Sequence, residues 1–99
     1  MNKAYEISQL NDWKGDARMY SLDVPVKYKT WQGDEEREFE TKFVIVSAIH
    51  DIITGVPETY IFPVNVVGKI LDWGELHGSY RGGLEHAQAL RNAGYEIIA

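Results

Sequence analysis

The chain has no cysteine among its 99 residues. That absence excludes a disulfide framework, a thiolate nucleophile and a sulfur-ligated zinc site. Long apolar runs are also missing, because no stretch approaches the roughly 18 consecutive apolar residues of a membrane-spanning helix. The first residues lack the apolar segment of a secretory signal peptide. We therefore expect a cytoplasmic protein that has no membrane partner.

Positive charge is in the minority, with ten Lys and Arg against fifteen Asp and Glu and a net charge of −5. Because binding to phosphates requires a basic patch, this balance argues against direct nucleic-acid binding. One acidic cluster is typical of the solvated end of a hairpin, although it could also mimic DNA phosphates in the nucleic-acid site of another protein. The cluster comprises Asp34, Glu35, Glu36, Glu38 and Glu40.

The rest of the composition is that of a globular protein, with 44% hydrophobic and 25% charged residues. The length suits a single domain over residues 1–99. Alternating apolar residues predict strands along most of the chain, and helical spacing is found only near the C-terminus. The sequence therefore predicts an α+β fold, in which an antiparallel sheet of four to five strands, a β-meander, carries one C-terminal helix on a face.

Two long alternating runs predict a hairpin. In the first, over residues 19–31, Tyr20, Leu22, Val24, Val26 and Tyr28 share one face. Pro25 cannot donate a ladder hydrogen bond, which places this strand at a sheet edge or gives it a bulge. The second run, residues 39–49, is apolar on both faces for much of its length, which predicts a central strand. Trp31, beside the turn between them, is expected to be partly exposed.

Shorter patterns complete the prediction. Strands are expected over 58–62, 69–73 and 95–98. A helix is expected from about Gly83 to Ala93, because apolar residues recur there at helical spacing and Gly94 suits the position after a helix end. Within residues 1–18, Tyr5, Ile7 and Leu10 fit either a strand or a single helical turn, and residues 13–16 are expected to form a loop.

The loop before this helix combines glycines, aromatic residues and charged residues. Backbone N–H groups at a helix N-terminus, with an arginine beside them, can hold a phosphate or a carboxylate. Aromatic residues next to arginine also dominate protein–protein interfaces. The alternative is structural, since glycines allow a tight turn and a tryptophan can close the core. The predicted partner- or ligand-binding residues are Trp73, Glu75, His77, Ser79, Tyr80, Arg81, Gly82 and Gly83.

The same region contains the residue types of catalytic and metal-binding sites. Two histidines and three acids fall within fifteen residues, at Asp72, Glu75, His77, Glu85 and His86. They lack the spacing of a dedicated metal site, and no Gly-x-Ser-x-Gly sequence is present. We therefore predict no metal, no cofactor and no catalytic residue. His86 is expected on the exposed flank of the helix.

The C-terminal half carries a resemblance. Its residues are Pro57-Glu58-Thr59-Tyr60-Ile61-Phe62-Pro63, Leu71-Asp72-Trp73-Gly74-Glu75-Leu76, Gly78-Ser79-Tyr80-Arg81-Gly82-Gly83, His86, Ala89-Leu90 and Ala93-Gly94-Tyr95. This half resembles a group of small uncharacterised proteins encoded by bacteriophages that infect actinobacteria. The resemblance brings no catalytic or binding residues with it. It implies a phage-encoded accessory protein that binds a host protein or blocks a host defence system.

Together these observations lead us to expect a non-enzymatic binding protein whose partner is a host protein. One alternative is a binder of a small ligand, a nucleotide or a phosphate, at the helix N-terminus around Arg81. Another is an acidic DNA-mimic inhibitor that uses residues 34–40. A homodimer is also possible, because the first strand with its proline and the short last strand leave sheet edges available for pairing.

Overall fold

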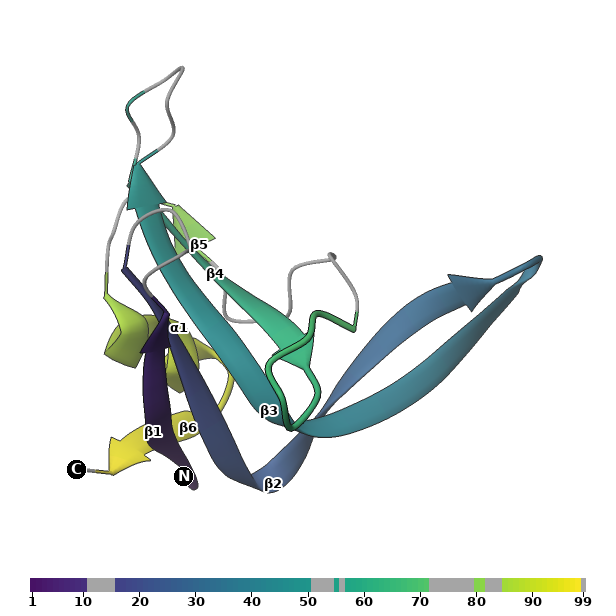
Figure 1. Cartoon of the computed structure of the whole chain (residues 1–99), viewed down its shortest axis with the longest axis horizontal. Coiled ribbons are helices and arrows are strands. Elements are labelled where there is room, and N and C mark those ends of the chain that lie inside the picture. The colour runs from purple at the N-terminus through teal and green to yellow at the C-terminus, as the bar shows by residue number, and fades with distance from the viewer. Residues whose placement is uncertain (11–15, 51–54, 56, 72–79, 82–84, 99) are drawn as a thin grey trace.

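The fold is that of a computed structural model, which describes residues 1–10, 16–50, 55, 57–71, 80–81 and 85–98 (Figure 1). These residues form a six-stranded sheet in the order β5-β4-β3-β2-β1-β6, with a helix against one face, so the predicted α+β class is confirmed. The elements are β1 (Asn2–Leu10), β2 (Asp16–Gln32), β3 (Glu35–His50), β4 (Pro57–Val64), β5 (Tyr80–Arg81), α1 (His86–Asn92) and β6 (Tyr95–Ile98).

The first four strands pair antiparallel in chain order, as a β-meander requires. The sheet as a whole is mixed, because β6 pairs parallel to β1, with Asn2 opposite Tyr95. The predicted antiparallel sheet with one C-terminal helix is confirmed as the main architecture, and the structure adds this parallel pair. The chain goes from β5 at one edge of the sheet to β6 at the other, and α1 lies on this path. Residues 2–10 form a strand, which decides between the two alternatives for the N-terminal segment.

Both faces of the sheet contribute to the core. The helix side holds the larger cluster, which comprises Ala4, Tyr20, Leu22, Val44, Val46, Ile61, Ala89, Leu90 and Tyr95. The alternate residues point to the opposite face, where the second cluster contains Ala17, Met19, Ile45 and Val64. Because β3 supplies buried residues to both clusters and lies between β4 and β2, its predicted central position is confirmed.

β2 lies inside the sheet rather than at its edge, and it contains a bulge. The register moves from Ser21 opposite Phe43 to Val26 opposite Thr41, so that residues 22–25 face Lys42 alone. The proline at position 25 falls inside this irregularity, where the missing N–H breaks no regular ladder. The edge prediction is therefore wrong, and the bulge prediction is confirmed.

The bulge shifts the register between β2 and β3 without separating the apolar side chains of β2. Tyr20 and Leu22 belong to the helix-side cluster, and Val26 and Tyr28 pack against that same cluster. Val24 is the exception, since it is 42% exposed. The apolar face predicted from alternation along residues 19–31 is therefore confirmed for the other four residues.

Two further predictions differ from the structure. Within residues 57–71 the expected strand over 69–73 is limited to an isolated bridge between Val64 and Ile70, and residues 72–73 lie outside the described part. The helix begins at His86 rather than near Gly83, because Glu85 has an extended backbone (φ −119°, ψ 113°). The last strand, β6, is found where the sequence predicts it.

Candidate functional site

The loop chosen from the sequence is described only in part. Trp73, Glu75, His77, Ser79, Gly82 and Gly83 lie outside the described residues. Tyr80 and Arg81 form β5, whose backbone pairs with β4 at Thr59 and Glu58. These two residues therefore belong to an end strand of the sheet and are separated from the start of α1. The loop remains a prediction.

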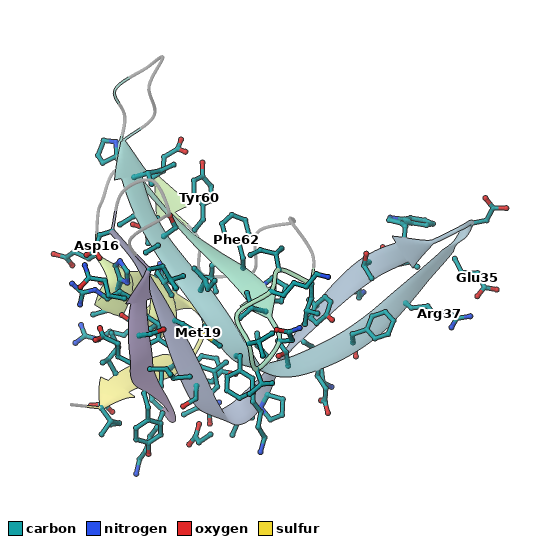
Figure 2. The ribbon with its side chains drawn as sticks, viewed as in Figure 1. Asp16, Met19, Glu35, Arg37, Tyr60 and Phe62 are labelled. Carbon is teal, nitrogen blue, oxygen red and sulfur yellow. The ribbon has the colours of Figure 1, made fainter. Side chains whose placement is uncertain are left out.

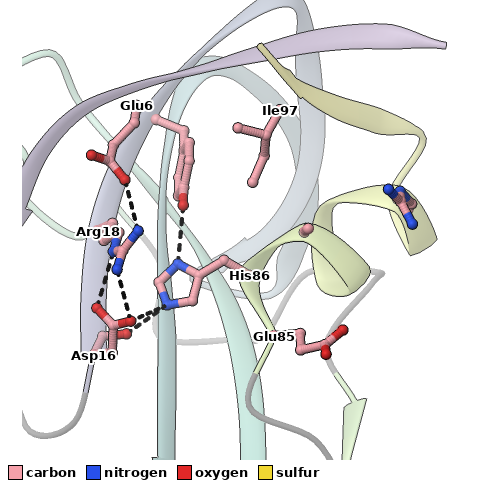
Figure 3. A pocket seen from close by; sticks show the side chains of 9 residues that line it. Glu6, Asp16, Arg18, Glu85, His86 and Ile97 are labelled. Atoms are coloured by element: carbon pink, nitrogen blue, oxygen red, sulfur yellow. Dashed lines mark hydrogen bonds and ion pairs between the residues drawn. The ribbon is translucent and has the colours of Figure 1, made fainter. Parts of the chain in front are cut away.

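A polar cluster that the sequence did not indicate lies between α1, β1 and β2 (Figure 3). We call it the His86 cluster, and it consists of Glu6, Asp16, Arg18, Tyr20 and His86. The expectation that His86 lies on the exposed flank of the helix is wrong, since only 8% of its surface is exposed. The spacing of apolar residues along the helix could not predict this burial. The residues of β2 that cover the His86 side chain lie some seventy positions earlier in the chain.

The hydrogen bonds of His86 define its tautomer. Its Nε2 lies 2.8 Å from the backbone carbonyl oxygen of Asp16, and its Nδ1 lies 3.1 Å from the Tyr20 hydroxyl. A carbonyl oxygen only accepts, so Nε2 carries the proton and donates it. In the neutral ring Nδ1 is then the acceptor, and the Tyr20 hydroxyl donates to it. Neutral His86 thus has a partner for each nitrogen.

Burial affects both titratable groups of this contact. It lowers the pKa of His86 below the ordinary 6.5, because removal from water disfavours the imidazolium. It raises the pKa of Tyr20 to about 12, with a further contribution from the negative charge of Glu6. Both groups are therefore neutral near pH 7, which matches the hydrogen bonds of the neutral tautomer.

Arg18 connects the two carboxylates of the cluster. Its guanidinium contacts Asp16 at 3.1 and 3.2 Å and Glu6 at 3.1 Å. The hydrogen bond with Asp16 is the main cause of a raised Arg18 pKa. These three side chains are partly exposed, so the ion pairs bring modest stability.

An open groove of about 520 Å³ adjoins the cluster, lined also by Glu85, Ala87, Arg91 and Ile97. Both nitrogens of the His86 imidazole are hydrogen-bonded to β2, at Tyr20 and Asp16. Among the described residues no three His, Asp or Glu side chains are arranged to hold a metal ion. The arrangement is therefore suited to docking α1 on the sheet, and we assign the His86 cluster a structural role.

The second candidate surface is the outer part of the β2–β3 hairpin, residues 26–41, which we call the arm. It extends away from the rest of the molecule as a twisted two-stranded ribbon (Figure 1). Among the described residues, β1 pairs with β2 no further than Leu22, and β4 pairs with β3 no further than Phe43. Both outer edges of the arm are thus without a neighbouring strand in that part of the chain.

The arm is built as a regular ladder closed by a tight turn. Seven residue pairs run from Val26 opposite Thr41 to Gln32 opposite Glu35. Gly33 has φ of 64°, as the first central position of a two-residue type II′ turn requires. One face carries a stacked aromatic pair, Tyr28 and Phe39, with ring centroids 5.8 Å apart. Figure 2 shows Glu35 and Arg37 near the far end of the arm.

The other face of the arm, which we call the charged face, has two rows of opposite charge. One row, on β2, consists of Lys27, Lys29 and Trp31, and the other, on β3, consists of Glu40, Glu38 and Glu36, each opposite its counterpart in that order. Diagonal ion pairs join the rows, from Lys27 to Glu38 at 3.9 Å and from Lys29 to Glu36 at 3.8 Å. At the end of this face Trp31 is 66% exposed, which confirms the expectation for this residue.

Comparison with protein-family models, curated proteins and solved structures finds no match to this chain. Within the described residues, α1 is the helix and is too short to cross a membrane.

Proposed function

We propose that the protein is a non-enzymatic binding protein and that the arm binds its partner, another protein. One observation carries the proposal: the arm holds a 66% exposed tryptophan at the end of a ribbon that leaves the body of the molecule. A two-stranded ribbon alone is marginally stable, and exposing an indole gains nothing for the fold. Tryptophan is, in contrast, among the residues that contribute most to protein interfaces.

The resemblance of the C-terminal half supports a specific setting for this binding. We propose that the chain is a phage-encoded accessory protein, that it acts in the host cytoplasm, and that its partner is a host protein that it modulates. This function requires no cofactor and no direct contact with nucleic acid.

The two alternative functions have less support. A nucleotide or phosphate at the helix N-terminus around Arg81 would face Glu85, the acidic residue that precedes this seven-residue helix. A DNA mimic would need an uncompensated row of carboxylates, yet Glu36 and Glu38 lie within ion-pair distance of two lysines. Glu85 would repel a bound phosphate, and the two lysines would weaken the attraction between the glutamates and a basic nucleic-acid site.

The test is a pull-down from bacterial lysate with tagged wild-type protein and two variants. Trp31→Ser removes the aromatic end of the arm, and Val67→Ser is the matched control, since Val67 is 81% exposed and lies outside the arm. We expect one protein to be retained near stoichiometry by the wild type and by the Val67 variant, and lost with the Trp31 variant. Equal retention by all three would exclude the arm as the binding surface.

A further inference from the structure

The charged face of the arm is complementary to itself, and we propose that it binds a second copy of this chain. The inference rests on the proposed function, because it names an occupant of the same arm. In the free protein a second copy covers the charged face and Trp31, and a partner protein must then compete with it.

The argument begins with the arrangement of charge. Directly opposite residues of an antiparallel pair point to the same face. Lys27 and Lys29 therefore form one row and Glu38 and Glu40 the other, on a single face of the ribbon. Each row has one sign of charge, and the rows run side by side along the arm.

Symmetry then selects one way for two arms to meet. If two charged faces meet about a two-fold axis along the arm, the lysine row of each copy lies over the glutamate row of the other. Lys27 then faces Glu40 of the second copy, and Lys29 faces Glu38 of the second copy. With the axis across the arm instead, lysines would lie over lysines and glutamates over glutamates, and like charges repel.

Pairing through the free edges of the arm is disfavoured by the same charges. Two β2 strands side by side would bring lysines together, and two β3 strands would bring glutamates together. Charged side chains on an exposed edge are a common protection against such pairing. The face of the arm, rather than its edge, is therefore the complementary surface.

Two further observations agree with this arrangement. Glu40 has no ion pair among the described residues, and in the dimer it meets Lys27 of the second copy. Trp31 lies opposite Glu36 at the end of the same face, so in the dimer each Trp31 lies over Glu36 of the second copy. The exposed indole is thereby removed from water. Figure 1 shows that the arm extends clear of the sheet, which leaves its face accessible to another arm.

The first test reverses each row in turn and measures mass by sedimentation velocity. Lys27→Glu with Lys29→Glu makes the face acidic, and Glu38→Lys with Glu40→Lys makes it basic. We expect a wild-type dimer, a dissociation constant raised roughly tenfold or more in each variant, and a heterodimer when the two variants are mixed. Lys3→Glu with Lys69→Glu, both exposed and outside the arm, matches the first variant in net charge and should remain dimeric.

The second test measures the direction of the arms without changing the charged face. The chain has no cysteine, so Asp34→Cys introduces a single thiol at the arm's turn. Parallel arms bring the two turns together, and oxidation should give a disulfide-linked dimer in high yield. Val67→Cys is the control, from which we expect little cross-linked product.

A wild-type protein that stays monomeric at every concentration would overturn the inference. So would a dimer that survives both charge reversals, or one in which Asp34→Cys cross-links no better than the control. These measurements use the purified protein alone. A failure here therefore leaves the pull-down result, and with it the proposed function, to be judged separately.

Discussion

The Tyr95 hydroxyl donates a hydrogen bond to the backbone carbonyl of Val24 over 2.7 Å, and so connects the last strand to the bulge at the base of the arm. A second contact holds the same bulge from β1, because the backbone N–H of Lys3 donates to the Asp23 carboxylate at 2.7 Å. The bulge is therefore fixed by both ends of the chain. Since the arm continues directly from it, these contacts determine the direction in which the arm leaves the sheet.

Tyr95→Phe should lower the free energy of unfolding by about 1 kcal/mol, because it removes one hydrogen bond and keeps the ring. The measurement is urea denaturation followed by fluorescence. Tyr5→Phe is the control, since Tyr5 is 40% exposed and its hydroxyl has no hydrogen bond to the described residues. Equal effects of the two substitutions would show that the Tyr95 contact does not stabilise the bulge.

Tyr20→Phe should cost more, about 1–3 kcal/mol, because it leaves the buried Nδ1 of His86 without a donor. Chemical denaturation against the same Tyr5→Phe control measures the difference. A cost no larger than that of the control would contradict the assignment of Tyr20 as donor and of Nε2 as the protonated nitrogen.

The buried His86 predicts a loss of stability in weak acid. Its pKa is lowered in the folded state, so below about pH 6.5 the unfolded chain takes up this proton first. Neutral His86 therefore makes its full contribution to the free energy of unfolding above that pH. As the pH decreases, this free energy falls by at most about 1.4 kcal/mol per pH unit, until the pKa of His86 in the folded state is reached. Denaturation curves between about pH 7.5 and 5 measure this slope.

His86→Gln provides the control for that experiment, because glutamine can donate and accept hydrogen bonds but does not titrate. Asp16 and Glu6 line the same groove and remain in the variant. The slope above about pH 5.5 should be smaller in the variant. An unchanged slope would mean that another group causes the pH dependence.

The aromatic pair of the arm should stabilise the hairpin locally. A double-mutant cycle of Tyr28→Ala and Phe39→Ala is expected to give a coupling energy of about 0.5–1.5 kcal/mol, since the two rings stack directly across the strands. Trp31 and Phe39 have no such stacking contact and provide a comparison cycle. A coupling near zero for Tyr28 and Phe39 would show that the rings are not held together in solution.

Local patterns in the sequence determined the strands of the meander. The alternation along residues 39–49 predicted a strand buried on both faces, and the structure places Val44 and Ile45 in different core clusters. The turn residues between the two long runs predicted the hairpin, and the exposure of Trp31 followed from its place beside that turn. Such features depend on residues close together in the chain, which is why periodicity reveals them.

Only the tertiary structure decided the features that depend on distant residues. The parallel pairing of β6 with β1, the burial of His86 and the contact of Tyr95 with Val24 all join residues at least 66 positions apart in the chain. The bulge at residues 22–25 interrupts the register between β2 and β3, although the alternation of the sequence continues through it. A local pattern predicts which residues are buried, but it does not predict which distant segment covers them. The arm projects because the pairing of β1 and of β4 ends before it, and this limit is set by the tertiary structure.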